Sequence, residues 1–154
     1  MNTTFKKILV PVDVGSGVPA ALGVAAAMAR AFHASVELFH VWQPPSLINA
    51  PLMVMSAGLD SRPIALEDLA RDAATTELKA FVAHARELGV SDASGRVGIG
   101  NPAHEILSLA ACGYDLIVMG THGRGGMAHA FLGSVAEKVV RRASCPVLTV
   151  RSSD

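Results

Sequence analysis

Five short apolar runs alternate along this chain with segments rich in helix-forming residues. The runs are too short for helices and are typical of buried strands, whereas the segments between them have the length and composition of helices. Strands alternating with helices at this spacing predict an α/β fold. It is a single doubly wound, Rossmann-like sheet of five parallel strands in the order 3-2-1-4-5, with helices on both faces. We expect one domain over residues 1–154, with strands at 6–12, 35–42, 96–99, 116–119 and 147–150 and helices at 17–32, 63–88, 101–112 and 134–142.

The composition is that of a compact globular protein, with 51% hydrophobic and 17% charged residues. The thirteen basic and thirteen acidic side chains cancel, and only 5% of residues are aromatic. The chain therefore lacks the basic field and the stacking side chains expected of a nucleic-acid-binding protein. Residues 38–59 contain no Asp, Glu, Lys or Arg, but Pro44, Pro45 and Pro51 would break a helix there. No membrane segment is expected.

The cysteines and the amino terminus predict a cytoplasmic location. Cys112 and Cys145 stand among apolar neighbours, and neither has a second thiol at redox-motif or metal-ligand spacing. We expect two reduced, buried thiols. The first seven residues also lack the form of a signal peptide, because no long apolar run follows their lysines.

A glycine-rich loop joins the fourth expected strand to the last expected helix. Gly123, Gly125, Gly126 and Gly133 carry no Cβ, so the backbone can take left-handed turns and bring its amides close to a ligand. The following helix N-terminus adds unpaired N–H groups and the positive end of the helix dipole, a combination suited to phosphate. Arg124 lies within the loop and either pairs with phosphate oxygens or stays solvated.

Asp13 stands at the end of the first expected strand. An open parallel sheet binds ligands beyond the carboxyl ends of its strands, at the crevice where the strand order reverses. With the first and fourth strands as neighbours there, Asp13 and the loop from Gly120 to Gly133 converge. A carboxylate in this place accepts hydrogen bonds from ribose hydroxyls. The alternative is an aspartate that only caps a turn or a helix.

The spacing Gly120-x2-Gly123-x9-Gly133-Ser134 resembles the nucleotide-binding signature of ATP-binding universal stress proteins. The resemblance includes Ile8–Asp13 as the first strand, Gly100–Ala103 at the start of a helix and Cys145–Val150 as the closing strand. It covers most of the chain and is weakest from Gln43 to Ser61. It implies a nucleotide-dependent regulatory or stress-response module that binds ATP, with Mg²⁺ arriving on the nucleotide.

The same resemblance implies a role for individual residues. The backbone around Val12 and Val41 would border the adenine, Asp13 would meet the ribose, and the glycines would follow the ribose and phosphates. The full set of implied nucleotide-binding residues, with Arg124 added from its place in the loop, is Pro11, Val12, Asp13, Val41, Met119, Gly120, Gly123, Arg124, Gly133, Ser134 and Val135. One departure concerns the turn after Asp13, where Ser16 is displaced and Val18 replaces a common hydroxylated residue. Whether this turn contacts phosphate is left open.

Ser134 also has a structural interpretation. Ser134-Val-Ala-Glu137 has the pattern of a capping box, in which the hydroxyl and the carboxylate satisfy helix-terminal amides. The two roles are compatible, because one hydroxyl can cap the helix in the free protein and contact phosphate in the bound one.

Two other functions are left open by the sequence. The first is a slow ATP hydrolase. No residue pattern supplies an obvious general base, catalytic nucleophile or dedicated metal site, so any ATPase activity is expected to be weak. The second is a nucleotide-free interaction protein that binds a protein partner through the apolar segment 43–58.

A homodimer is expected through the last strand. Residues 146–150 would lie at an edge of the sheet with no later strand to cover them. We expect the amides of Leu148 and Val150 to be available for antiparallel pairing with a second copy, as is common in the family that the chain resembles. The alternative is a short edge left in solvent.

Overall fold

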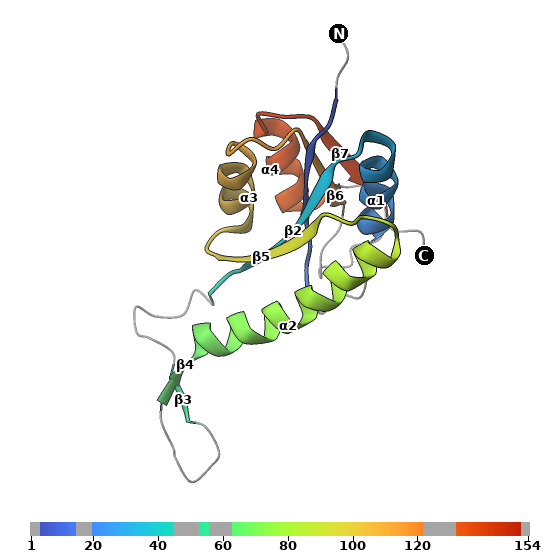
Figure 1. The fold of residues 1–154 in the computed structure, drawn as a ribbon. Helices are drawn as coiled ribbons and strands as arrows, with labels where there is room; N and C mark the ends of the chain where they lie inside the picture. The colour runs from blue at the N-terminus through green and yellow to red at the C-terminus, as the bar shows by residue number, and fades with distance from the viewer. Residues whose placement is uncertain (1–3, 15–19, 45–52, 56–62, 122–131, 152–154) are drawn as a thin grey trace.

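The computed structural model describes residues 4–14, 20–44, 53–55, 63–121 and 132–151. These residues form a five-stranded sheet, all parallel, in the order β5-β2-β1-β6-β7. This is the predicted order 3-2-1-4-5, so the expected fold is confirmed (Figure 1). The strands of the sheet are β1 (Lys7–Pro11), β2 (Ser35–Trp42), β5 (Ala93–Ile99), β6 (Leu116–Gly120) and β7 (Val147–Val150).

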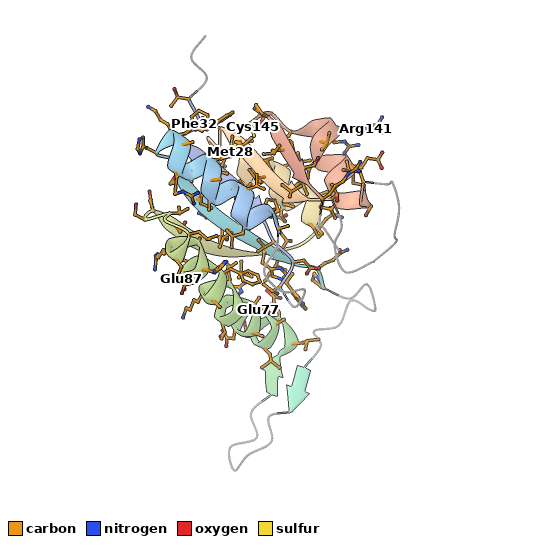
Figure 2. The ribbon with its side chains drawn as sticks, turned by 90° about the vertical axis from the view of Figure 1, so that its right-hand side faces the viewer. Met28, Phe32, Glu77, Glu87, Arg141 and Cys145 are labelled. Carbon is orange, nitrogen blue, oxygen red and sulfur yellow. The ribbon has the colours of Figure 1, made fainter. Side chains whose placement is uncertain are left out.

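Helices cover both faces of the sheet. The helices α1 (Ala20–Phe32) and α2 (Leu66–Glu87) pack on one face, and α3 (Pro102–Ala110) and α4 (Ser134–Arg142) pack on the other. Figure 2 shows this layering from the side, with α1 and α4 on opposite sides of the strands. Among the described residues, no helix is both long and apolar enough to cross a bilayer.

The central strand β1 shows how the sequence pattern produces this sandwich. Ile8 and Val10 point into the core shared with α1 and α2, whereas Leu9 points into the core shared with α3 and α4. All three side chains are fully buried. Successive side chains of a strand alternate between faces, so a strand covered on both faces needs an unbroken apolar run. This run identifies β1 from sequence alone.

The longest helix begins later than predicted. Its first residue is Leu66, because Pro63–Ala65 forms strand β4, which pairs antiparallel with β3 (Met53–Met55). Proline lacks an N–H group and is tolerated in such an edge strand, so Pro63 marks the hairpin and not the helix start. Figure 1 shows this small sheet at the N-terminal end of α2, apart from the large sheet. Of the apolar segment 43–58, residues 45–52 and 56–58 lie outside the described residues.

Strand β5 begins at Ala93, three residues before the predicted start at Arg96. Two of its residues are glycines, which have low strand propensity and hide the strand in the sequence. A Cβ on Gly95 would lie 2.9 Å from the Leu78 side chain, and one on Gly98 would lie 2.7 Å from the Phe39 ring. The glycines therefore let α2 and Phe39 pack directly against the β5 backbone.

The sequence predicted two buried cysteines, and this prediction is wrong. Both thiols are free, but Cys112 is exposed and Cys145 is half-buried. Helix α3 ends at Ala110, so Cys112 falls in the turn beyond it. There its Sγ lies 3.5 Å from the Ser108 carbonyl oxygen.

Strand β7 lies at the edge of the sheet, but its free backbone groups differ from those predicted. The Pro146 carbonyl accepts a hydrogen bond from Ile117 of β6, and the Val150 carbonyl accepts one from Thr121, directly after β6. Alternate residues of a strand face the same neighbour, so Leu148 also faces β6. The amides of Val147 and Thr149 face the open edge instead. The expectation that Leu148 and Val150 amides are available is therefore wrong.

Candidate functional site

The carboxyl ends of β1, β2 and β6 meet at one edge of the sheet. Pro11 lies level with Phe39 of β2, and Leu9 lies level with Ile117 of β6. Three residues further along each strand, this register places Val12 level with Gly120. Asp13 follows Val12 at the point where β1 leaves the sheet. This is the switch point of a doubly wound fold, because β1 lies at the centre of the sheet with β2 on one side and β6 on the other.

The turn that carries Asp13 is tied to the end of β2. The Val12 amide donates to the Phe39 carbonyl at 2.9 Å. The buried imidazole of His40 lies next to the same turn, with Nδ1 at 3.1 Å from the Val12 oxygen and 3.5 Å from the Val14 nitrogen. The side chains of Val12 and Val14 are buried, and Asp13 between them is partly exposed. The imidazole thus lies against the backbone on both sides of Asp13.

His40 was not among the site residues predicted from the sequence. A polar residue inside the apolar run of β2 was the available signal, because an imidazole buried in a strand requires a hydrogen-bond partner.

The two ends of the glycine-rich loop meet at the carboxyl end of β6. The Thr121 amide donates to the Val150 carbonyl at 3.0 Å, which extends the β6–β7 pairing past Gly120. The Thr121 carbonyl in turn accepts a 2.7 Å hydrogen bond from the Gly133 amide. The chain therefore leaves β6 and returns to it before α4 begins. Gly123 and Arg124 lie between these ends, outside the described residues.

The predicted capping box at the start of α4 is wrong. Gly133 is the N-cap residue, no side chain caps the helix there, and Ser134 is already the first helical residue, with its side chain exposed. The Glu137 carboxylate instead accepts from Arg141, one turn further on, at 3.2 Å. The spacing of a capping box was present, but the helix begins one residue too early for Ser134 to use it. Among the described residues, no side chain therefore accepts from the first amides of α4, which have no partner within the helix itself.

Val41 and Met119 lie on the same face of the sheet. Met119 is buried in the core beneath α3 and α4, and Val41 packs against that core while partly exposed. Pro11 and Gly120 end their strands partly exposed, and Val135 is half-buried in the first turn of α4. The described members of the predicted set thus come from β1, β2, β6 and α4. The topology brings the three strand ends to one edge of the sheet, and the Gly133–Thr121 bond brings the start of α4 to the end of β6.

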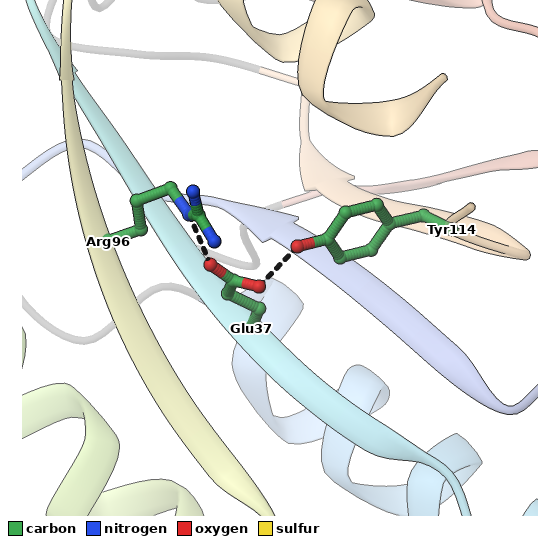
Figure 3. Close-up of polar contacts among 3 residues, drawn as sticks. All are labelled: Glu37, Arg96 and Tyr114. Carbon is green, nitrogen blue, oxygen red and sulfur yellow. Dashed lines mark hydrogen bonds and ion pairs between the residues drawn. The ribbon is translucent and has the colours of Figure 1, made fainter. Parts of the chain in front are cut away.

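A second polar cluster lies toward the amino ends of the strands and was not predicted. Glu37 of β2 accepts hydrogen bonds from the Arg96 Nε, at 2.5 Å, and from the Tyr114 hydroxyl (Figure 3). The Lys7 ammonium lies 4.2 Å from the centre of the Tyr114 ring, a cation–π contact. A carboxylate in the apolar run of β2 was the sequence signal for it.

The environment of Glu37 keeps it ionised. Burial raises the pKa of Glu37, but the hydrogen bonds from Tyr114 and Arg96, with the charges of Arg96 and Lys7, outweigh burial and leave the pKa below its ordinary value. Burial, followed by the bond to Glu37, raises the pKa of the Tyr114 hydroxyl. The cluster is satisfied by its own members and links β2, β5 and the start of β6. Its role is structural.

The sequence model of the universal stress protein family matches residues 4–151. The chain belongs to the universal stress protein family. It is 35% identical over 150 residues to a universal stress protein of Thermus aquaticus, covering 96% of this chain and 99% of the relative. It is 32% identical to universal stress protein MJ0531 of Methanocaldococcus jannaschii, covering 96% and 82% of the two chains.

Solved structures of this family share the fold at low sequence identity. A universal stress protein in complex with cAMP superposes with a TM-score of 0.70 at 22% identity, over 97% of this chain and 99% of that one. The Archaeoglobus fulgidus protein in complex with dAMP gives a TM-score of 0.63 at 23% identity, over 94% and 97% of the two chains.

Within the described residues of this chain, no group of three or more His, Cys, Asp or Glu side chains is arranged to hold a metal ion.

Proposed function

We propose that this universal stress protein binds ATP at the carboxyl edge formed by β1, β2 and β6. The observation that carries the proposal is the hydrogen bond from the Gly133 amide to the Thr121 carbonyl. It brings the uncapped start of α4 to the end of β6, whose neighbour β1 leads to Asp13. Unpaired helix-terminal amides suit phosphate, and a carboxylate at a strand end suits ribose. These are the two polar parts of a nucleotide.

Most residues of the predicted set receive a role in this proposal. Asp13 would accept hydrogen bonds from the ribose hydroxyls, and the backbone of Val12 with the side chain of Val41 would border the adenine. The amides of Ser134 and Val135 would hold the terminal phosphates, which would approach closely to the Gly133 backbone. Mg²⁺ would accompany the nucleotide as its phosphate complex.

The comparisons supply independent support for the ligand class. The two structural relatives in complex with cAMP and dAMP hold adenine nucleotides. The spacing of Gly120, Gly123, Gly133 and Ser134 resembles the signature of the ATP-binding members. We therefore propose ATP over another purine nucleotide, and a cytoplasmic, nucleotide-dependent regulatory role in the stress response. We also propose that residues 1–154 act as one domain that forms a homodimer through β7.

Titration calorimetry with ATP tests the proposal, after the purified protein has been checked for carried-over nucleotide. Asp13→Ala is expected to weaken ATP binding about tenfold or more, because a hydrogen bond to a charged group is worth roughly 1.5–3 kcal/mol. Asp92→Ala removes the same charge from an exposed position before β5 and should leave the affinity unchanged. Absence of ATP and ADP from the isolated protein, together with no heat of binding, contradicts the proposal.

A further inference from the structure

His40 is a buried polar residue on a face of β2 that is otherwise apolar. Only 6% of its surface is exposed, and its neighbours on the same face, Val36 and Leu38, belong to the core under α1 and α2. An imidazole buried among such side chains is destabilising unless a hydrogen bond compensates for the lost water. Its contacts therefore show what the side chain does in this position.

The ring nitrogen Nδ1 faces the backbone on both sides of Asp13. It lies 3.1 Å from the Val12 oxygen and 3.5 Å from the Val14 nitrogen. One nitrogen carries either a proton or a lone pair, so it cannot serve both groups at once. The shorter contact has ordinary hydrogen-bond length and the longer one does not. We assign a proton to Nδ1, which donates to the Val12 carbonyl.

This bond continues the attachment of β1 to β2 where the strand pairing ends. The last backbone bond between the two strands runs from the Val12 amide to the Phe39 carbonyl. Beyond it, the chain turns away from the sheet and carries Asp13 outward. The imidazole holds the carbonyl that immediately precedes Asp13, so it restrains the peptide plane from which the carboxylate projects.

We propose that His40 is a positioning residue for the nucleotide: it fixes the turn at Val12–Val14 so that Asp13 meets the ribose hydroxyls. The inference rests on the proposed function, because it assigns His40 an effect on the Asp13–ribose contact. Its neighbour Val41 points to the other face of β2, where the adenine is proposed to lie. The end of β2 would then support the ribose from one face and the base from the other.

Two substitutions separate this role from simple packing. His40→Phe keeps a ring of similar shape but removes the donor. His40→Asn loses the ring but places an amide nitrogen at the position of Nδ1, so it can still donate to the Val12 carbonyl. If only packing matters, Phe is the milder change. If the hydrogen bond matters, Asn is the milder change.

The readout is the ratio of affinities for ATP and for 2′,3′-dideoxy-ATP, which lacks both ribose hydroxyls. In the unmodified protein we expect ATP to bind about tenfold more tightly than the dideoxy compound. His40→Phe should lose most of this preference while its dideoxy-ATP affinity stays within about twofold, and His40→Asn should retain it. Asp13→Ala should lose the preference whichever residue occupies position 40. Circular dichroism confirms that each variant is folded.

Amide hydrogen exchange at residues 12–14 provides a second readout that needs no nucleotide. His40→Phe should raise exchange in this turn, and His40→Asn should leave it near the unmodified rate. A preference for ATP that is unchanged in His40→Phe overturns the positioning role alone. Unchanged exchange in His40→Phe overturns it even when no nucleotide binds. No ATP binding by the unmodified protein overturns the proposed function itself.

Discussion

The Gly133 amide donates a 2.7 Å hydrogen bond to the Thr121 carbonyl, across a gap of eleven residues in the sequence. This bond closes the base of the glycine-rich loop and sets the start of α4 beside the end of β6. It also uses the Gly133 amide internally, so that the amides available to a ligand begin at Ser134 and Val135. The phosphate contacts proposed for Gly133 therefore depend on close approach to its backbone rather than on its N–H group.

Gly133→Val should abolish or strongly weaken ATP binding without unfolding the protein. The backbone angles of Gly133, φ −58° and ψ 153°, are accessible to any residue, so the substitution needs no strained conformation. A branched side chain at this point would occupy the space through which phosphate approaches the helix start. We expect an affinity loss of about tenfold or more by calorimetry, with a melting temperature within a few degrees of the unmodified protein.

Ser134→Ala tests whether the Ser134 hydroxyl caps α4. Because no side chain caps α4, loss of the hydroxyl should change the free energy of unfolding by no more than about 0.5 kcal/mol. A loss of about 1 kcal/mol, typical of a removed cap, would mean that the capping box forms after all. ATP binding by Gly133→Val at unmodified strength would argue against phosphate at the start of α4.

The sheet was predictable because its strands are buried on both faces. Uninterrupted apolar runs such as Ile8–Val10 and Leu116–Met119 have few alternatives, and the order of a doubly wound sheet follows from alternation with helices. The limits of β2, α4 and β7 were predicted to the residue. Strand β5 was harder, because its glycines at 95 and 98 serve packing against Leu78 and Phe39, which the local sequence does not reveal.

The errors occurred where a local motif competed with tertiary geometry. The capping-box pattern at Ser134 was real, but the first helical bond runs from the Glu137 amide to the Gly133 carbonyl, so Gly133 is the N-cap residue. Pro63 is typical of a helix start, but in the structure it pairs with Met55 and belongs to a strand. His40 and Glu37 were missed for another reason. Each is a polar residue in an apolar strand, and its partners come from other segments of the chain.

Thr149→Pro should convert a dimer into a monomer. The Thr149 amide faces the open edge of β7, so proline there removes a donor to a second copy and leaves the β6–β7 bonds intact. Light scattering at micromolar concentration should show a dimer for the unmodified protein and a monomer for the variant. Leu148→Pro is the contrasting change: it removes a bond to β6 and should lower the melting temperature as well.

Two results would argue against this interface. A monomeric unmodified protein would show that β7 remains a solvent-exposed edge, consistent with a Leu148 side chain that is 36% exposed in the single chain. A dimer that persists in folded Thr149→Pro would place the interface elsewhere.

The two thiols should differ in reactivity toward a disulfide reagent. Cys112 is exposed, whereas Cys145 is half-buried, and burial together with the charge of Asp115 raises the pKa of its thiol. The thiolate is the reactive form, so at pH 8 Cys112 should react about tenfold faster or more. Cys112→Ser should remove the fast phase and Cys145→Ser the slow one. A fast phase that survives Cys112→Ser would contradict the exposure found here.

Glu37→Gln should destabilise the protein at neutral pH and flatten its stability toward acid. The substitution keeps the shape of the side chain but removes the charge held by Arg96 and Tyr114. Because Arg96 has a side chain 55% exposed, solvent screens part of the interaction. We expect a loss of about 1–2 kcal/mol in the free energy of unfolding.

The direction of the pH effect follows from the lowered pKa of Glu37. A carboxyl whose pKa is lower in the folded than in the unfolded state stabilises the fold above its ordinary pKa, here 4.5. That stabilisation disappears as the pH falls through the lower, folded value. Urea unfolding from pH 7 downward should therefore show the unmodified protein and Glu37→Gln converging below about pH 4.5. Glu67→Gln, in an exposed pair with Arg71, should follow the unmodified protein within about 0.5 kcal/mol throughout. A Glu37→Gln difference that stays constant down to acid pH would show that the charge of Glu37 does not stabilise the fold.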